Sequence, residues 1–191
     1  MITSTESPVS IENADFMFEN SLVRVIANRN SQEIELAGLK IGPLQEGVEY
    51  EVRFWVAQEL TKAGIARFRE EDELDPIKLN KIHWKERVQT VKQISPLPED
   101  FYPRLRRCMK DYKRKANSTP EKLAEYDKII RLSRDIVNCR LKKIISLASA
   151  PAQTDQFLKC LTKEERALYT CLYDIITGWR NEILKGGGKN E

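Results

Sequence analysis

Residue types that build metal and redox sites are scarce in this chain of 191 residues. It contains a single histidine, His83, so a typical histidine-based metal triad cannot form. The four cysteines are Cys108, Cys139, Cys160 and Cys171, and no two of them form a C-x-x-C pair. We therefore expect buried free thiols, and we predict neither a metal site nor a cofactor.

Long apolar runs and catalytic motifs are missing as well. No run of about 18 apolar residues occurs, and the first residues lack the order of a secretory signal, so we expect an intracellular protein without membrane contact. The phosphate loop G-x-x-x-x-G-K-[ST], the G-x-G-x-x-G fingerprint and the G-x-S-x-G elbow are all absent. The sequence therefore favours an interaction or scaffold protein over an enzyme.

Charge is abundant but unevenly distributed. Residues 1–60 hold ten acids and four bases, whereas residues 61–191 hold 28 bases and 19 acids. The net charge of +3 therefore combines an acidic segment of −6 with a basic segment of +9. Such a split indicates two modules with different surfaces.

The apolar spacing changes its period within residues 42–68. Apolar and charged residues alternate over 48–54, which predicts a strand with one buried face. From Trp55 the spacing becomes helical, and Gly64 is placed to stop a helix over 55–63. We therefore predict an α+β fold, with a small β-rich module over residues 1–69 and a mostly α-helical bundle domain over residues 70–191.

The β-rich module is expected to contain short elements. A helical turn over 11–20 would bury Ile11, Phe16 and Phe18. The β-branched run 21–27 predicts a strand, with residues 32–37 as its hairpin partner and residues 65–69 as a further short strand.

Two helices are predicted at the start of the bundle. Asp75-Pro76 is a favourable helix start, and the helix that follows would bury Leu79 and Ile82, with Trp84 or Val88 as further candidates. A second helix begins near Glu99. Its apolar stripe consists of Phe101, Leu105, Cys108 and Tyr112.

The other faces of that second helix form the densest basic patch in the chain. Two interpretations stay open: a solvated helix face, or an electrostatic contact with DNA or an acidic protein surface. No aromatic residues are interleaved as base-stacking platforms, which weakens direct binding of single strands. The basic patch consists of Arg104, Arg106, Arg107, Lys110, Lys113, Arg114 and Lys115.

A long helix is predicted over 122–149, opened by a capping box of Ser118 and Glu121. It carries two apolar stripes, which suits either a central helix or a subunit interface. One stripe contains Leu123, Tyr126, Ile130, Val137, Leu141, Ile144 and Ala148. The other contains Ile129, Leu132, Ile136 and Cys139.

Two further helices complete the bundle. Thr154 is predicted to cap a short helix, and a capping box of Thr162 and Glu165 opens the last one, over 163–184. The apolar stripe of this last helix consists of Leu168, Leu172, Ile175, Trp179 and Ile183.

The sequence resembles a known family at several motifs. They are residues 19–28 (Glu-Asn-Ser-Leu-Val-Arg-Val-Ile-Ala-Asn), 41–44 (Ile-Gly-Pro-Leu) and 52–57 (Val-Arg-Phe-Trp-Val-Ala), followed by Leu74-Asp75 and by Leu97-Pro98 with Phe101-Tyr102. Together they are similar to GINS subunits of the Psf-two/Psf-three type, in which the small β domain comes first. The resemblance covers about 19–185, by identity up to 112 and by pattern beyond. The family commonly has Pro where this chain has Arg53.

The resemblance implies a non-catalytic subunit of the GINS tetramer, the scaffold of the replicative helicase assembly. Its implied partners are a sister GINS subunit of reversed domain order, the MCM hexamer, a RecJ-like protein and DNA polymerase or primase. The resemblance also allows a contact with DNA, of an indirect kind. The composition suits an archaeal version, which would act in the cytoplasm or nucleoid, whereas a eukaryotic one would act in the nucleus. The expected partner interface consists of Leu141, Ile144, Leu172, Ile175, Trp179 and Ile183.

An alternative function follows from the basic patch without the resemblance. A stand-alone nucleic-acid-binding helical module would use the face over residues 104–115 and would shift DNA without partners.

Overall fold

The computed structural model describes residues 11–69, 73–89, 93–150 and 155–185, and its strands precede most of its helices. The predicted α+β fold is confirmed. Contacts within the chain divide it into two units, residues 12–73 and residues 74–191 together with the first eleven. The predicted boundary after residue 69 stays a prediction, because residues 70–72 lie outside the described ranges.

The β-rich unit contains two small antiparallel sheets. Strand β1 (Leu22–Ala27) lies between β4 (Glu49–Arg53) and β5 (Ala66–Phe68), and β2 (Ile34–Leu36) pairs with β3 (Leu39–Ile41). The predicted hairpin between 21–27 and 32–37 is therefore wrong. Ala37 and Gly38 both have positive φ and form a two-residue turn that joins β2 directly to β3.

Two helices accompany these strands, α1 (Ile11–Glu19) and α2 (Phe54–Lys62). Helix α2 begins directly after β4 and is followed by Gly64, which has a positive φ, as the change of period predicts. Phe18 is buried and its ring lies 4.4 Å from that of Phe54. Phe16 is exposed, contrary to the prediction, because side chains two positions apart on a helix point to different faces. The side chain of Ile11 lies outside the described residues.

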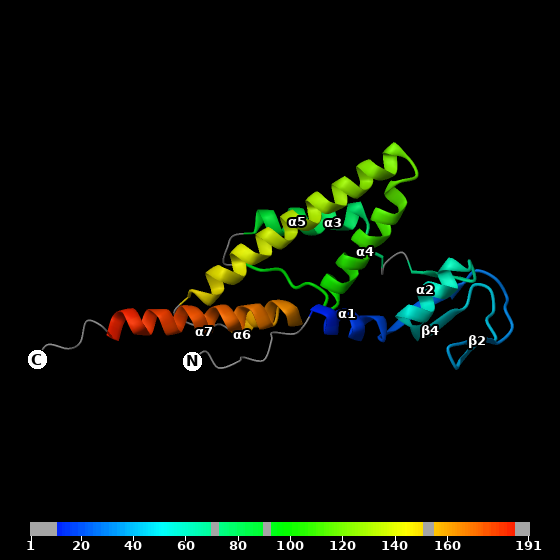
Figure 1. Cartoon of the computed structure of the whole chain (residues 1–191), viewed down its shortest axis with the longest axis horizontal. Helices are drawn as coiled ribbons and strands as arrows, with labels where there is room; N and C mark the ends of the chain where they lie inside the picture. Colours follow the sequence, from blue (N-terminus) through cyan, green and yellow to red (C-terminus); the bar gives the residue numbers. More distant parts are fainter. Residues whose placement is uncertain (1–10, 70–72, 90–92, 151–154, 186–191) are drawn as a thin grey trace, which may run out of the picture. The chain divides into compact units, whose positions relative to one another are not determined.

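The helical unit consists of α3 (Pro76–Val88), α4 (Phe101–Ala116), α5 (Pro120–Ala148), α6 (Asp155–Leu158) and α7 (Lys163–Lys185). Helix α5 is central, since it packs against α3, α4 and α7. Figure 1 shows α4 and α5 as an antiparallel pair joined at one end. Of the two interpretations of the apolar stripes, the central position in the bundle is therefore observed for α5.

Side-chain caps fix where three of these helices begin. Asp75 accepts a hydrogen bond of 2.7 Å from the Lys78 amide, as predicted. At α5 the cap is Thr119 rather than Ser118, because Pro120 occupies the first helical position and leaves the preceding residue to accept from the Lys122 amide. The predicted cap at Thr154 lies outside the described residues.

The capping box at the start of α7 is confirmed. The Thr162 amide donates to Glu165 Oε2 over 3.0 Å, and the Glu165 amide donates to Thr162 Oγ1 over 3.3 Å. Both side chains are buried, so this cap lies inside the unit instead of on its surface.

Apolar packing in the helical unit is concentrated in two clusters. Leu79 lies in the first, but Trp84 and Val88 are exposed because they occupy the opposite face of α3, which corrects their proposed burial. The first cluster contains Leu79, Phe101, Leu105, Cys108, Ile129, Leu132 and Ile136. The second contains Ile94, Ile144, Ala148, Leu161 and Tyr169.

Candidate functional site

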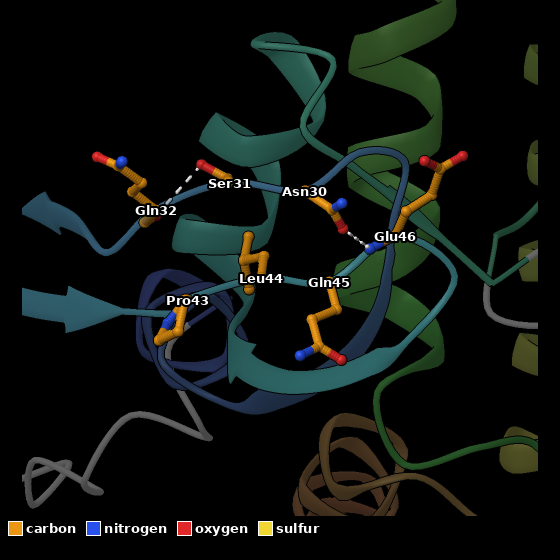
Figure 2. Close-up of a pocket in the computed structure, with 7 residues that line it drawn as sticks. All are labelled: Asn30, Ser31, Gln32, Pro43, Leu44, Gln45 and Glu46. Atoms are coloured by element: carbon orange, nitrogen blue, oxygen red, sulfur yellow. Dashed lines mark hydrogen bonds between the residues drawn. The ribbon is translucent and has the colours of Figure 1, made fainter.

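A shallow pocket on the β-rich unit offers little chemistry (Figure 2). Glu46 is the one titratable residue among those that line it. The side-chain oxygen of Asn30 accepts a hydrogen bond from the Glu46 amide over 2.8 Å, so this polar group holds the loop together. The lining residues are Asn30, Ser31, Gln32, Pro43, Leu44, Gln45 and Glu46.

Metal binding and membrane insertion find no support within the described ranges. There, no group of three or more His, Cys, Asp or Glu side chains is placed to hold a metal ion. All four cysteines are free thiols, but only Cys108 is buried, so the predicted burial is wrong for the other three. The helices in these same ranges are too short or too polar to cross a membrane.

A buried ion network lies where α3, α5 and α7 meet. Arg140, on α5, has 0% of its side chain exposed, and it pairs with Glu86 of α3 at 3.1 Å and with Glu165 of α7 at 2.6 Å. Lys143, one turn further along α5, pairs with Glu86 at 2.7 Å. Two acids therefore balance two bases, which offsets the cost of removing the charges from water.

Every donor of the Arg140 guanidinium is used. Beyond the two glutamates, Nη1 donates to the Ser95 carbonyl over 2.6 Å and Nη2 to the Cys160 carbonyl over 3.2 Å. Nε and Nη2 each donate to Glu165, and Nη1 donates to Glu86. Together these five hydrogen bonds satisfy all five N–H groups. The side chain thus joins three helices and two connecting segments.

Tyr102 extends the network to α4. Its hydroxyl donates to Glu165 Oε1 over 2.6 Å, and burial, helped by the negative charge of Glu165, raises the pKa of this phenol above its usual range. Burial by itself would lower the pKa of Arg140, but its hydrogen bonds to Glu165 and the nearby acids raise that pKa instead. Tyr102 is therefore neutral and Arg140 charged.

Sequence reasoning missed this network, although a signal was present. Arg140 stands four residues after Ile136 and four before Ile144, so it continues a row of buried side chains along α5. A charged residue in such a row indicates a buried ion pair, and Glu165, already identified as a capping residue, was a candidate partner.

Helix α7 presents an apolar face that nothing in the described part of the chain covers. Ile175, Trp179 and Ile183 are 68%, 64% and 60% exposed. Leu172, by contrast, is partly buried against the chain's own second cluster. Near the exposed end, Arg180 Nη2 donates to the Ser149 carbonyl over 3.0 Å, which anchors this part of α7 to the end of α5.

Helix α5 adds half-exposed apolar residues to the same unit. Val137, Leu141 and Ile145 recur every four residues and are each about two-fifths exposed. Ile144, which the sequence assigned to the partner interface, is only 1% exposed and packs inside the second cluster. It is therefore unavailable to a partner in this structure, because the buried row of α5 passes through it.

The basic patch on α4 is only partly free. Arg104 pairs with Asp100 at 2.7 Å and Arg114 with Asp111 at 2.6 Å, while the Arg107 side chain is largely buried beside Asp111. Lys110, Lys113 and Lys115 are exposed, which both interpretations of the patch require. Arg106 is intermediate in exposure.

Comparison with known proteins gives matches over most of the chain. The family model described as "GINS complex protein helical bundle domain" matches residues 67–184, and the one described as "PSF2 N-terminal domain" matches residues 10–68. The DNA replication complex GINS protein PSF2 of Homo sapiens is 27% identical over 130 residues, and that of Xenopus laevis is 25% identical over 130 residues. Each alignment covers 68% of this chain and 66% of the relative, slightly less than two thirds of the relative's length.

Proposed function

This chain belongs to the GINS family as a subunit of the Psf-two type, and on that premise we propose that it is a non-catalytic assembly subunit of a replicative helicase complex. Other GINS subunits are its partners by family membership. We further propose that it assembles with a sister subunit of reversed domain order. The complex would then bridge the MCM hexamer, a RecJ-like protein and polymerase or primase inside the cell.

The exposed apolar face of α7 is the observation that supports assembly best. Large apolar side chains that lie together on a helix surface are typical of binding sites rather than of solvated helices. Residues 181–185 are all exposed, so the last turn of α7 projects beyond the packing of its own unit. The proposed sister-subunit interface therefore comprises Ile175, Trp179 and Ile183, with Leu172 and Leu141 at its edge.

Trp179→Ala is expected to weaken assembly with the sister subunit by about 2 kcal/mol or more, because a tryptophan at an interface is commonly a hot spot. Co-expression followed by mass measurement with light scattering gives the readout. Ile175→Asp should abolish the complex at micromolar concentrations, since it would bury an unpaired charge.

Asn181→Ala is the matched control, since Asn181 is exposed on the opposite face of the same helix. It should assemble as the unaltered chain does. A chain that stays monomeric with every GINS partner, or a Trp179→Ala variant that assembles normally, would refute the interface.

The exposed lysines of the basic patch are proposed to steer an acidic surface of the MCM hexamer or nearby DNA. Reversing Lys110 and Lys113 to Glu should weaken that association on the order of tenfold at low salt, and the difference should shrink as salt screens it. Lys122 and Lys128 are exposed on α5, and reversing both to Glu changes the net charge by the same amount outside the patch. This control should weaken the association less. Equal losses in both variants would contradict the assignment.

A stand-alone nucleic-acid-binding module remains the second candidate, favoured only by the same exposed lysines. A gel-shift experiment at physiological salt separates the two functions. A dedicated binder shifts DNA without partners and loses the shift on reversal of Lys110 and Lys113, whereas an assembly subunit does not shift DNA by itself.

A further inference from the structure

Helix α3 carries an apolar stripe that points away from its own core. Ile77, Trp84 and Val88 are separated by seven and four residues, a spacing that places them on one face of the helix. They are 67%, 66% and 62% exposed. The opposite face carries Leu79 and Glu86, which are buried. Helix α3 thus has large apolar side chains on two opposite sides, and the described part of its unit covers only the side with Leu79.

The surroundings of this stripe are cationic. Lys81 lies between Ile77 and Trp84 along the stripe, and Lys85 and Arg87 lie on either side of it. All three are exposed. The one acid of α3, Glu86, is buried and engaged with Arg140 and Lys143, so it does not neutralise them.

Besides the partly buried Lys78, His83 is the remaining titratable group of α3 beside this surface. It is mostly buried, and its Nε2 lies 4.0 Å from Asp135 of α5, on the side of α3 that faces the core. Asp75, at the start of α3, is engaged in capping the helix. Neither acid therefore occupies the outward face.

The shape and the charge of the face select one class of partner. The stripe runs for about 16 Å at 1.5 Å per residue, which is the length of three turns of a helix. A helix laid along it would need an apolar row to cover Ile77, Trp84 and Val88 and acidic residues beside that row to meet the cations. Single-stranded nucleic acid is a poorer fit, since one aromatic ring flanked by aliphatic side chains offers a single stacking position.

We propose that the outward face of α3, formed by Ile77, Lys81, Trp84, Lys85, Arg87 and Val88, is a docking site for an acidic amphipathic helix of a partner protein. This site is separate from the exposed face of α7 and does not depend on that assembly role. It would give the subunit a second contact, and the proposal requires this face to stay open when the GINS complex is assembled.

The test uses the subunit within its assembled GINS complex and a fluorescein-labelled synthetic helix of about 18 residues with Leu and Phe on one face and Glu on its flanks. Fluorescence anisotropy should show at least tenfold tighter binding of this peptide than of the same peptide with Lys at each Glu. Trp84→Ala should weaken binding of the acidic peptide at least tenfold, and Lys81→Glu with Lys85→Glu should reverse the preference.

Leu123→Ala is the matched control, because Leu123 is an exposed apolar residue of α5 in the same unit. It should bind the peptide normally, and all variants should keep their helix content and their assembly. Unchanged binding by Trp84→Ala would overturn the proposal. Binding of the peptide by the free chain but not by the complex would also overturn it, because a GINS subunit would then cover the face. Displacement of the peptide by oligo-dT would overturn it as well, since the face would then bind nucleic acid.

Discussion

Replacing Arg140 with alanine should lower the free energy of unfolding of the subunit by about 3–5 kcal/mol, the usual cost of removing one partner from a buried ion pair. Glu86 and Glu165 would stay buried with only Lys143 to balance them. Their carboxylates would also lose the three hydrogen bonds that Arg140 donates, two to Glu165 and one to Glu86. Urea denaturation monitored by far-UV circular dichroism measures the loss.

Arg134→Ala is the control for this prediction, since Arg134 lies on the same helix and is exposed. Its effect should fall within about 0.5 kcal/mol. A second variant, Arg140→Met with Glu165→Gln, removes the guanidinium together with the carboxylate that it alone balances, leaves the Glu86–Lys143 pair intact, and should recover part of the stability. If Arg140→Ala were as stable as the control, the network would not hold the helices together.

Two isoleucines of α5 should separate stability from assembly. Ile136 is 0% exposed and Ile145 is 42% exposed. Ile136→Ala should therefore cost about 2–5 kcal/mol, because it leaves a cavity in the first apolar cluster. Ile145→Ala should change the stability of the isolated chain little, since much of its side chain already contacts water.

The same pair of variants should behave in the opposite order in assembly. Once folded, Ile136→Ala presents an unchanged surface, whereas Ile145→Ala removes exposed apolar area one turn from Leu141, which belongs to the edge of the proposed sister-subunit interface. Denaturation and mass measurement on both variants give the comparison. If Ile145→Ala were the more destabilising of the two in the isolated chain, the described burial of α5 would be contradicted.

Local sequence signals predicted most elements of this fold. The change of period before Trp55, the cap at Asp75 and the capping box of Thr162 and Glu165 each depend on residues within one turn of each other. Strand pairing was predicted less well. Residues 32–37 are a suitable strand, but the positive φ of Ala37, which an alanine rarely adopts, determines that their partner is β3 and not β1.

The parts that sequence reasoning missed depend on contacts across long separations. Arg140 meets Glu86 and Glu165, which are 54 and 25 residues away, and a pattern read within one helix cannot reveal such partners. Apolar stripes posed a related difficulty. Ile144 and Ile175 both belong to regular apolar rows, yet Ile144 is buried and Ile175 is exposed. The packing of neighbouring helices decides which apolar row is covered, and the row itself does not reveal it.

The saturated guanidinium of Arg140 has a consequence for how the helical unit opens. Its five hydrogen bonds end on α3, on the segment around Ser95, on the segment around Cys160 and on α7. Local opening of any of these segments leaves a buried N–H group without an acceptor, which raises the cost of opening one segment alone. Their amides should therefore exchange hydrogen for deuterium as one cooperative group, slower than the exposed end of α7.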